Sequence, residues 1–134
     1  MPTYAEANEI AAQLLGKKIS QQAWALRANI ARVAEVAEAD RRIIEVHPEV
    51  SFRALAGAHV GFPKMTWNGQ ALRRRALERA GIMLPDELGE GGDVPVGDVL
   101  DAAAAAWSAR RYAQRRAKSL PGDAEPDARQ VIWY

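Results

Sequence analysis

The stretch Arg42-Ile43-Ile44-Glu45-Val46-His47-Pro48 decides how the rest of the chain can fold. Ile43 and Ile44 are consecutive β-branched residues, a pattern typical of a parallel strand that helices cover on both faces. Pro48 lacks a backbone donor and favours an extended residue before it, so we expect the strand to end there. Glu45 then lies near the carboxyl end of a buried strand, where open α/β sheets place ligands and metals. Because a buried carboxylate is costly without a partner, Glu45 marks a candidate site.

Length and composition predict one soluble globular domain over residues 1–134. The chain has 134 residues, 49% of them hydrophobic, and a net charge of +1. It has no cysteine, which excludes disulfides and thiolate metal sites and fits a reducing cytoplasm. Its first residues do not resemble a signal peptide, and no stretch approaches the roughly 18 apolar residues of a membrane span. We therefore expect a cytoplasmic protein without a membrane segment.

The segments before the strand carry helix signals. Thr3-Tyr4-Ala5-Glu6 has the capping-box spacing and predicts a helix from Tyr4 to Leu15, which Gly16 can end. Ser20 can cap a second helix that runs to about Ala39. The apolar residues of this second helix alternate steps of four and three, which predicts one buried stripe, and they are Ile19, Ala23, Leu26, Ile30 and Val33.

After the strand, predicted helices alternate with loops. The last of these helices is rich in alanine, with acidic residues before it and basic residues in its second half, an order that favours the helix dipole. In chain order we expect a short helix at 50–56, a loop at 57–63, a helix from Asn68 or Gly69 to Ala80, a surface loop at 85–97, a long helix at 98–118, a loop at 121–127 and a terminal strand at 130–134.

Three carboxylates form the first candidate site: Glu45 at the strand end, and Asp98 with Asp101 at the start of the alanine-rich helix. Residues three apart share a helix face, so both aspartates can point to one place. Clustered carboxylates are the usual ligands of Mg²⁺ or Mn²⁺, and two such ions can support phosphodiester cleavage. The alternative is that Asp98 caps the helix and Asp101 only faces its dipole. We expect Asp98 to be the more exposed of the two.

A second group of polar residues follows the strand: His47, Lys64, Thr66 and Arg73. Basic side chains at such a place can hold phosphate oxygens, which makes His47, Lys64 and Arg73 candidate substrate-binding residues. The alternative is an ordinary solvated surface. The same two interpretations apply to the basic residues between Arg110 and Lys118, which can contact a nucleic-acid backbone or can simply complement the helix dipole.

Four blocks of residues carry a family resemblance. They are Ser20-Gln21-Gln22-Ala23-Trp24, Glu45-Val46-His47-Pro48-Glu49-Val50-Ser51-Phe52, Lys64-Met65-Thr66-Trp67-Asn68-Gly69 with Arg73, and Asp98-Val99-Leu100-Asp101-Ala102 leading to Ala105-Ala106-Trp107. In this order they resemble the domain-of-unknown-function family numbered four hundred and twenty-nine, described as predicted RNase H-like nucleases. The resemblance covers about residues 15 to 134.

The resemblance implies an RNase H-like fold with a metal site similar to that of Holliday-junction resolvases. Glu45 matches the acid at the end of the fourth strand, and Asp101 with Asp98 matches the acids that open the last helix. Lys64 and Arg73 match family positions whose role is unassigned. Family members begin with a glycine-flanked aspartate on a first strand and two further strands, which this chain does not contain. We therefore expect a mostly helical α/β fold, a partial RNase H-like fold that lacks the first three strands.

This departure leaves three interpretations of function. The first is a nuclease-family domain with a partial site for Mg²⁺ or Mn²⁺, inactive alone and completed by another chain, with nucleic acid as its partner. The second is a non-catalytic binding or assembly module. The third is a small helical protein in which the acids are merely caps.

The predicted strand also has a consequence for assembly. A single buried strand cannot satisfy its own backbone groups, and an open edge favours pairing with another chain. The terminal segment from Val131 to Tyr134 can cover one edge only. We therefore expect a homodimer or a complementing chain.

Overall fold

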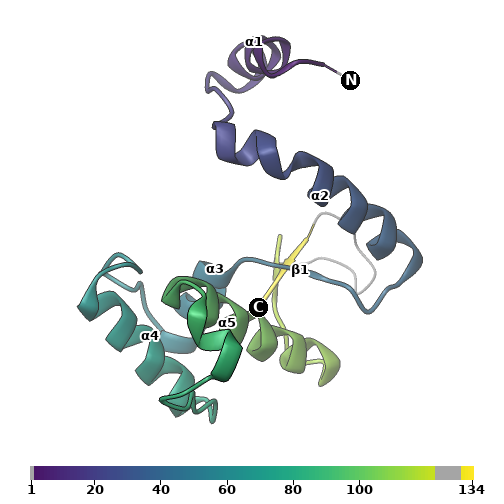
Figure 1. Ribbon diagram of the computed structural model, residues 1–134. Coiled ribbons are helices and arrows are strands. Elements are labelled where there is room, and N and C mark those ends of the chain that lie inside the picture. The colour runs from purple at the N-terminus through teal and green to yellow at the C-terminus, as the bar shows by residue number, and fades with distance from the viewer. Residues whose placement is uncertain (1, 123–130) are drawn as a thin grey trace. The chain divides into compact units, whose positions relative to one another are not determined.

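In the computed structural model, which describes residues 2–122 and 131–134, the chain forms two units, Met1–Ile43 and Ile44–Tyr134. The described part is mostly helical, with five α-helices and a small three-stranded mixed sheet (Figure 1). The elements are α1 (Tyr4–Leu15), α2 (Gln21–Ala39), β1 (Glu45–Val46), α3 (Pro48–Ala56), α4 (Trp67–Arg79), the 3-10 helix η1 (Gly89–Asp93), α5 (Val96–Ala113), β2 (Ser119–Leu120) and β3 (Ile132–Trp133). None of the described helices is long and apolar enough to cross a membrane.

The first unit consists of α1 and α2, and both helices begin where the sequence predicts. Thr3 and Glu6 form the capping box of α1, and Gly16 ends it in the left-handed conformation with φ of 64°. Ser20 caps α2 through a hydrogen bond from the Ala23 amide. The link between the helices is polar: Tyr4 Oη donates to the Ile19 carbonyl over 2.9 Å.

The predicted burial of the α2 stripe is wrong within this unit. Leu26, Ile30 and Val33 are 48%, 62% and 58% exposed. The physical reason is the geometry of the α1–α2 link, which joins α1 to the start of α2 only, through Tyr4 against Trp24 and the bonds around Ile19. The capping signals therefore fix the helix ends, but α1 does not cover the apolar face.

The predicted strand from Arg42 to Val46 shrinks to two residues. Arg42 donates its backbone N–H and its guanidinium to the Asp40 carboxylate, and the Ile43 amide donates to the Asp40 carbonyl over 3.1 Å. These bonds form a turn where the strand was expected. The hydrogen bonds from the Arg42 guanidinium and amide lower the pKa of the Asp40 carboxyl to about 2. Ile43 is consequently 40% exposed, so the expected burial on both faces is also wrong.

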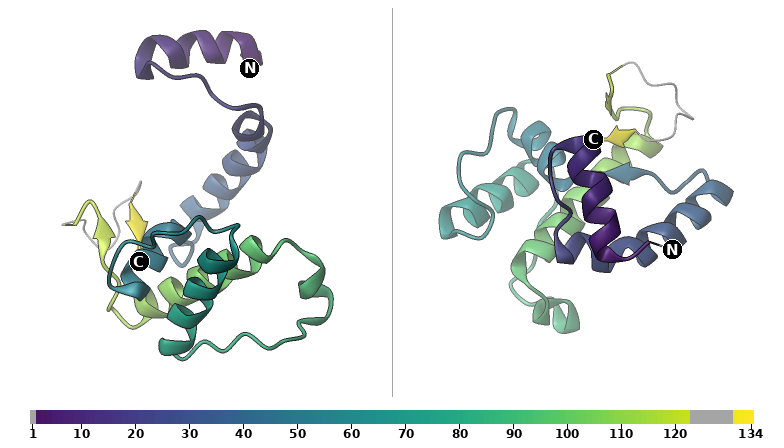
Figure 2. Two further views of the ribbon diagram at one scale, coloured as in Figure 1. Left: turned by 90° about the vertical axis from the view of Figure 1, so that its left-hand side faces the viewer. Right: turned by 90° about the horizontal axis from the view of Figure 1, so that it is seen from above.

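The second unit has its core between α3, α4 and α5, which pack against one another (Figure 2). The core side chains come from all three helices, which the apolar residues at helical spacing explain. The buried members are Phe52, Leu77, Leu100, Ala103 and Ala104, with Leu55, Val60, Ile82 and Leu84 packed around them. The Ser51 and Ser108 hydroxyls are buried in the same region and share a hydrogen bond of 2.7 Å, which joins α3 to α5.

The sheet has the strand order β1-β3-β2. β3 pairs with β1 in parallel, Glu45 opposite Ile132, and with β2 in antiparallel, Ser119 opposite Trp133. The prediction that the terminal segment covers one edge of β1 is therefore confirmed. In this three-stranded order β1 and β2 remain edge strands.

Two further boundaries differ from the prediction. The loop expected at 85–97 contains η1, and α5 begins at Val96. At the other end α5 stops at Ala113, because Arg115 takes a φ of 57° and the Arg116 amide turns back to the Arg111 carbonyl. Most of the loop predicted at 121–127, and Gln130 of the predicted terminal strand, lie outside the described residues.

Gly69 in α4 provides a test of this packing. A Cβ at this position would clash with the Pro63 carbonyl oxygen, whereas one at Gly61 would meet nothing within 4 Å. We expect Gly69→Ala to lower the free energy of unfolding by about 2–3 kcal/mol, the upper range for overpacking, because a backbone carbonyl must move. Gly61→Ala is the matched control and should change it by less than about 0.5 kcal/mol. Urea denaturation measures both, and equal midpoints for the two variants would contradict the close contact at Gly69.

Candidate functional site

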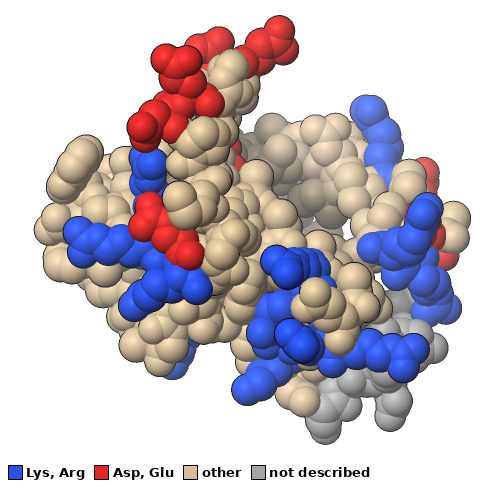
Figure 3. All heavy atoms as spheres, turned by 90° about the horizontal axis from the view of Figure 1, so that it is seen from below, with Lys and Arg blue, Asp and Glu red and all other residues tan. Residues whose placement is uncertain are grey.

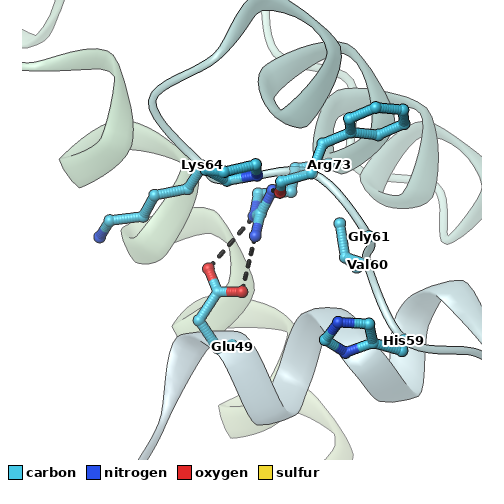
Figure 4. Close-up of a pocket in the computed structure, with 8 residues that line it drawn as sticks. Glu49, His59, Val60, Gly61, Lys64 and Arg73 are labelled. Carbon is cyan, nitrogen blue, oxygen red and sulfur yellow. Dashed lines mark hydrogen bonds and ion pairs between the residues drawn. The ribbon is translucent and has the colours of Figure 1, made fainter.

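Arg73 on α4 is the most buried charged residue among the described residues of the second unit, with 3% of its side chain exposed. Its guanidinium donates to both Glu49 carboxylate oxygens, Nη2 to Oε2 over 2.6 Å and Nε to Oε1 over 3.2 Å. Nη1 donates to the backbone carbonyls of Phe62 and Gly69, at 3.1 and 3.0 Å. Figure 4 shows the paired contacts between Arg73 and Glu49. These bonds join α3, the 57–63 loop and α4, so the observed role of Arg73 is structural. Its role in substrate binding stays a prediction.

Lys64 pairs with a different carboxylate, on α5. Its Nζ donates to Asp101 Oδ2 over 2.8 Å, and the side chain extends away from the Arg73–Glu49 pair in Figure 4. The Lys64 pKa is raised, mainly because Asp101 accepts this hydrogen bond, and the charges of Asp101, Glu49 and Asp98 add to the effect against partial desolvation. Lys64 therefore remains an ammonium at neutral pH and supplies positive charge at the start of α5.

The Asp101 carboxylate is only half satisfied. Oδ1 is buried and has no hydrogen-bond partner among the described residues, while Oδ2 accepts from Lys64. A buried carboxylate oxygen favours a donor or a cation, because leaving it alone costs desolvation energy. Asp98 is exposed and Asp101 half-buried, which confirms the expected order of exposure. The expected cap role of Asp98 is wrong, because α5 begins two residues earlier and Pro95 occupies the N-cap position.

Glu45, the third predicted ligand, lies on the edge strand β1 and is exposed. Glu45 was a candidate because a buried carboxylate is energetically costly without a partner. Since its carboxylate is exposed, that reason does not apply. Among residues 2–122 and 131–134, no three acidic or histidine side chains are grouped so that they could hold a metal ion. Glu45, Asp98 and Asp101 thus do not form a three-ligand metal site by themselves, and their catalytic roles stay predictions.

The polar residues after the strand have mainly structural contacts. The His47 carbonyl accepts hydrogen bonds from the Val50 and Ser51 amides at the start of α3, and its side chain is exposed. Thr66 caps α4: its hydroxyl accepts from the Gly69 amide and donates to the Pro63 carbonyl over 2.8 Å. A pocket of about 380 Å³ lies next to the Arg73–Glu49 pair, and it is lined by Glu49, His59, Val60, Gly61, Phe62, Pro63, Lys64 and Arg73.

The basic residues after Trp107 separate into two groups because α5 ends early. Arg110 and Arg111 lie in its last turn, where the helix dipole favours them. Arg111 also stacks on Trp107 with 4.7 Å from its Cζ to the ring centroid. Arg115, Arg116 and Lys118 follow the helix and are exposed, so the dipole does not explain them. In Figure 3 many Lys and Arg side chains lie over the lower part of the face shown, and a group of Asp and Glu side chains lies at its upper edge.

Sequence reasoning missed two partners in this region. Glu49 was not a candidate, although it stands in the same quoted block as Glu45. The Lys64–Asp101 pair was also missed, because each residue was assigned to a different group. The signal that both pairs share is opposite charge between two of the quoted blocks that lie far apart in the sequence.

The fold is mostly helical α/β, and two ion pairs join three of the four sequence blocks that carry the resemblance, those that begin at Glu45, Lys64 and Asp98. The chain belongs to the family described as "Protein of unknown function (DUF429)", whose model matches residues 1–126. The family model therefore includes α1, whereas the sequence resemblance began at about residue 15. No curated protein matches the chain, and neither does any solved structure.

The Arg73 contacts generate a second test. Arg73→Met removes four hydrogen bonds and an ion pair from a buried position. Breaking a buried pair costs about 3–5 kcal/mol, and we expect about 3 kcal/mol here because Glu49 is half exposed. Arg74→Met is the matched control, since Arg74 is exposed and lies 3.8 Å from an exposed Asp86. Urea denaturation at neutral pH should separate the variants; a loss no greater than in the control would contradict a structural role.

Proposed function

We propose that this chain is a nuclease-type domain with a partial divalent-cation site, and that it does not cleave nucleic acid alone. The observation that supports the proposal is the Lys64–Asp101 pair together with the buried, unpartnered Asp101 Oδ1. One carboxylate oxygen lacks a hydrogen-bond donor among the described residues, while an ammonium already balances the charge of the other. The described residues do not fit a resident metal centre without further ligands, so no catalytic step is assigned to a metal.

Lys64 is central to this proposal because it is itself a cation among carboxylates. Its ammonium is in contact with Asp101, and the charges of Glu49 and Asp98 act on it as well. A divalent ion that binds Asp101 must compete with this ammonium. Because Lys64 is 39% exposed, the competition is modest, about 1 kcal/mol for a pair of this kind. The side chain can therefore be displaced, and it can then contact a phosphate oxygen.

The first test is cleavage. We expect purified chain to show no cleavage of single- or double-stranded DNA or RNA with Mg²⁺ or Mn²⁺, since the described carboxylates do not group into a metal centre. Labelled oligonucleotides resolved on denaturing gels provide the measurement, with Glu45→Gln and Asp101→Asn run in parallel. Metal-dependent cleavage that both substitutions abolish would refute the proposed inactivity.

The second test is cation binding, followed by Mn²⁺ titration. We expect the wild-type chain to bind more weakly than about 1 mM, the range of sites with few ligand charges. Lys64→Met should increase the affinity roughly fivefold to tenfold, because it removes about 1 kcal/mol of competition. Asp101→Asn, added to Lys64→Met, should remove this gain.

Lys17→Met is the control for net charge, because Lys17 is exposed and belongs to the first unit. A Lys64→Met variant that titrates like this control would show that Lys64 does not occupy a cation position. Glu45→Gln reports separately whether Glu45 contributes to the same site, since it would then reduce the gain that Lys64→Met produces.

A second candidate function, a non-catalytic binding or assembly module, is favoured by a different observation. The exposed apolar residues of α2 and the exposed basic residues after α5 are surfaces that the described parts of their own units do not cover. The basic residues suit a nucleic-acid backbone, and the apolar residues suit a protein. Such a module requires no metal, so the titration separates it from the first proposal.

A further inference from the structure

The charge of the chain is unevenly distributed along its sequence. Residues 102–134 contain six basic and three acidic residues, a net charge of +3, whereas residues 1–101 have a net charge of −2. Between Asp101 and Asp123 the sequence has no acid, and the five basic residues of this stretch all fall in residues 110–118. A concentration of positive charge in one segment is typical of a surface that binds a polyanion.

Most of these basic side chains have no acidic partner in the structure. Arg110, Arg115, Arg116 and Lys118 are exposed, and within residues 2–122 and 131–134 none of them forms an ion pair with a carboxylate. We call these four residues the basic turn. The dipole of α5 accounts for Arg110 in its last turn, but the other three lie beyond the helix. Their charges are therefore available to a ligand.

Backbone hydrogen bonds hold the basic turn in a defined shape. The Arg116 amide donates to the Arg111 carbonyl over 2.8 Å, and Arg111 Nη2 donates to the Arg116 carbonyl over 2.7 Å. Lys118 exchanges two backbone hydrogen bonds with Tyr134, of 2.7 and 2.9 Å. The chain after α5 is thus folded back on the last turn of the helix. Basic residues on such a preorganised segment lose less conformational entropy when they bind.

Arg115 occupies a position where glycine is the usual residue. It follows Gln114, the C-cap of α5, and takes a φ of 57°, the left-handed conformation that disfavours a side chain. The helices α1 and α3 end in this conformation with glycines instead, Gly16 and Gly57. A charged side chain therefore stands here at a cost in backbone energy, and backbone strain of this kind is concentrated at functional sites.

The aromatic rings near the basic turn are already in contact with other side chains. Arg111 Cζ lies 4.7 Å from the centroid of the Trp107 ring, and the Tyr112 and Trp133 rings meet edge to face with centroids 5.0 Å apart. Proteins that bind single-stranded nucleic acid stack unpaired bases on open aromatic rings. Because these three rings are half-buried and engaged, the basic turn offers charge rather than a stacking surface.

The apolar residues of the same segment do not suit a membrane surface. Within residues 110–122, all of which the structure describes, Leu120 is the one large aliphatic side chain that is exposed, at 44%. Helices that bind membranes carry a continuous apolar face beside their basic residues, and the apolar face of α5 is buried in the core, with Leu100 and Ala104. Phosphates in solution remain as the ligand, and duplex nucleic acid carries them at high density, about one per 1.7 Å of helix axis.

We propose that the basic turn binds the phosphate backbone of duplex nucleic acid without reading its sequence. Arginine and lysine side chains are the usual partners of phosphate oxygens, and contacts to the backbone alone carry no sequence information. The inference rests on the second candidate function, the binding module, to which it gives a ligand and a site. It does not depend on the cation site at Asp101.

The salt dependence of binding tests the proposal. Fluorescence anisotropy of a labelled duplex in EDTA measures the affinity without metal, and contacts to four phosphates predict a slope of about −3.6 for log affinity against log salt. Arg116→Gln with Lys118→Gln should reduce this slope by about 2 and the affinity by about sixtyfold near 0.1 M salt. Arg75→Gln with Arg79→Gln is the matched control, since both arginines are exposed on α4 and the loss of charge is the same. The control should keep the wild-type slope.

Arg115→Gly separates a ligand contact from a structural role. Glycine adopts the left-handed conformation without strain, so the midpoint of thermal unfolding should be at or above that of the wild-type chain. The same substitution should reduce the salt slope by about 1 and the affinity by about eightfold near 0.1 M salt. Unchanged affinity in this variant would show that Arg115 does not contact the duplex.

Several outcomes would overturn the proposal. A wild-type chain that does not bind the duplex at low salt would do so, and so would an equal loss of slope in the α4 control; neither result bears on the Mn²⁺ titration. Tighter binding to the single strand, or to vesicles of phosphatidylserine and phosphatidylcholine, would assign the basic turn to a different polyanion. Two duplexes of unrelated sequence should bind equally, and a difference of more than about tenfold would contradict recognition of the backbone alone.

Discussion

The second unit depends on one constraint: a guanidinium buried among helices must have its N–H donors bonded. Arg73 meets this constraint with the Glu49 carboxylate and the carbonyls of Phe62 and Gly69, so its bonds fix α3, α4 and the loop between them. Phe52 lies 5.4 Å beneath the same guanidinium and is fully buried in the core. The polar network and the apolar core are therefore parts of the same packing, and neither can change without the other.

The need to bond buried polar groups also explains residues that the sequence suggests as binding or catalytic residues. Thr66 caps α4, Gly69 leaves room for the Pro63 carbonyl, and Arg73 closes the network one turn later. Lys64 differs, because its ammonium is 39% exposed and its partner Asp101 retains a buried oxygen without a hydrogen bond among the described residues. A half-buried polar group that lacks part of its hydrogen bonds is a candidate for ligand binding, whereas a fully bonded group is explained by its structural contacts. By that criterion Asp101 is the strongest candidate and Glu45, exposed on an edge strand, is the weakest.

Capping signals predicted both ends of α1 and the start of α2, whereas the ends of α5 and the tertiary features were predicted poorly. Thr3, Gly16 and Ser20 fixed the bounds of α1 and α2, since capping depends only on neighbouring residues. The strand prediction at Ile43 failed because Asp40 and Arg42 form a turn, and side-chain competition of this kind is invisible to a hydrophobicity pattern. The partners of Arg73 and Lys64 lie 24 and 37 residues away, so no spacing rule could find them. The family was predictable because it rests on ordered blocks rather than on contacts.

Both units bind charged side chains within the unit. In the second unit the charged residues of the quoted blocks bind one another, Arg73 with Glu49 and Lys64 with Asp101. In the first unit the Arg42 guanidinium bonds to the Asp40 carboxylate. Charges that bind one another stabilise a fold and require no ligand, so a charged residue in a family block is not by itself evidence of chemistry. Membership in the family therefore does not by itself give this chain a catalytic role, and the case for a site rests on Asp101, where one carboxylate oxygen has no hydrogen bond among the described residues.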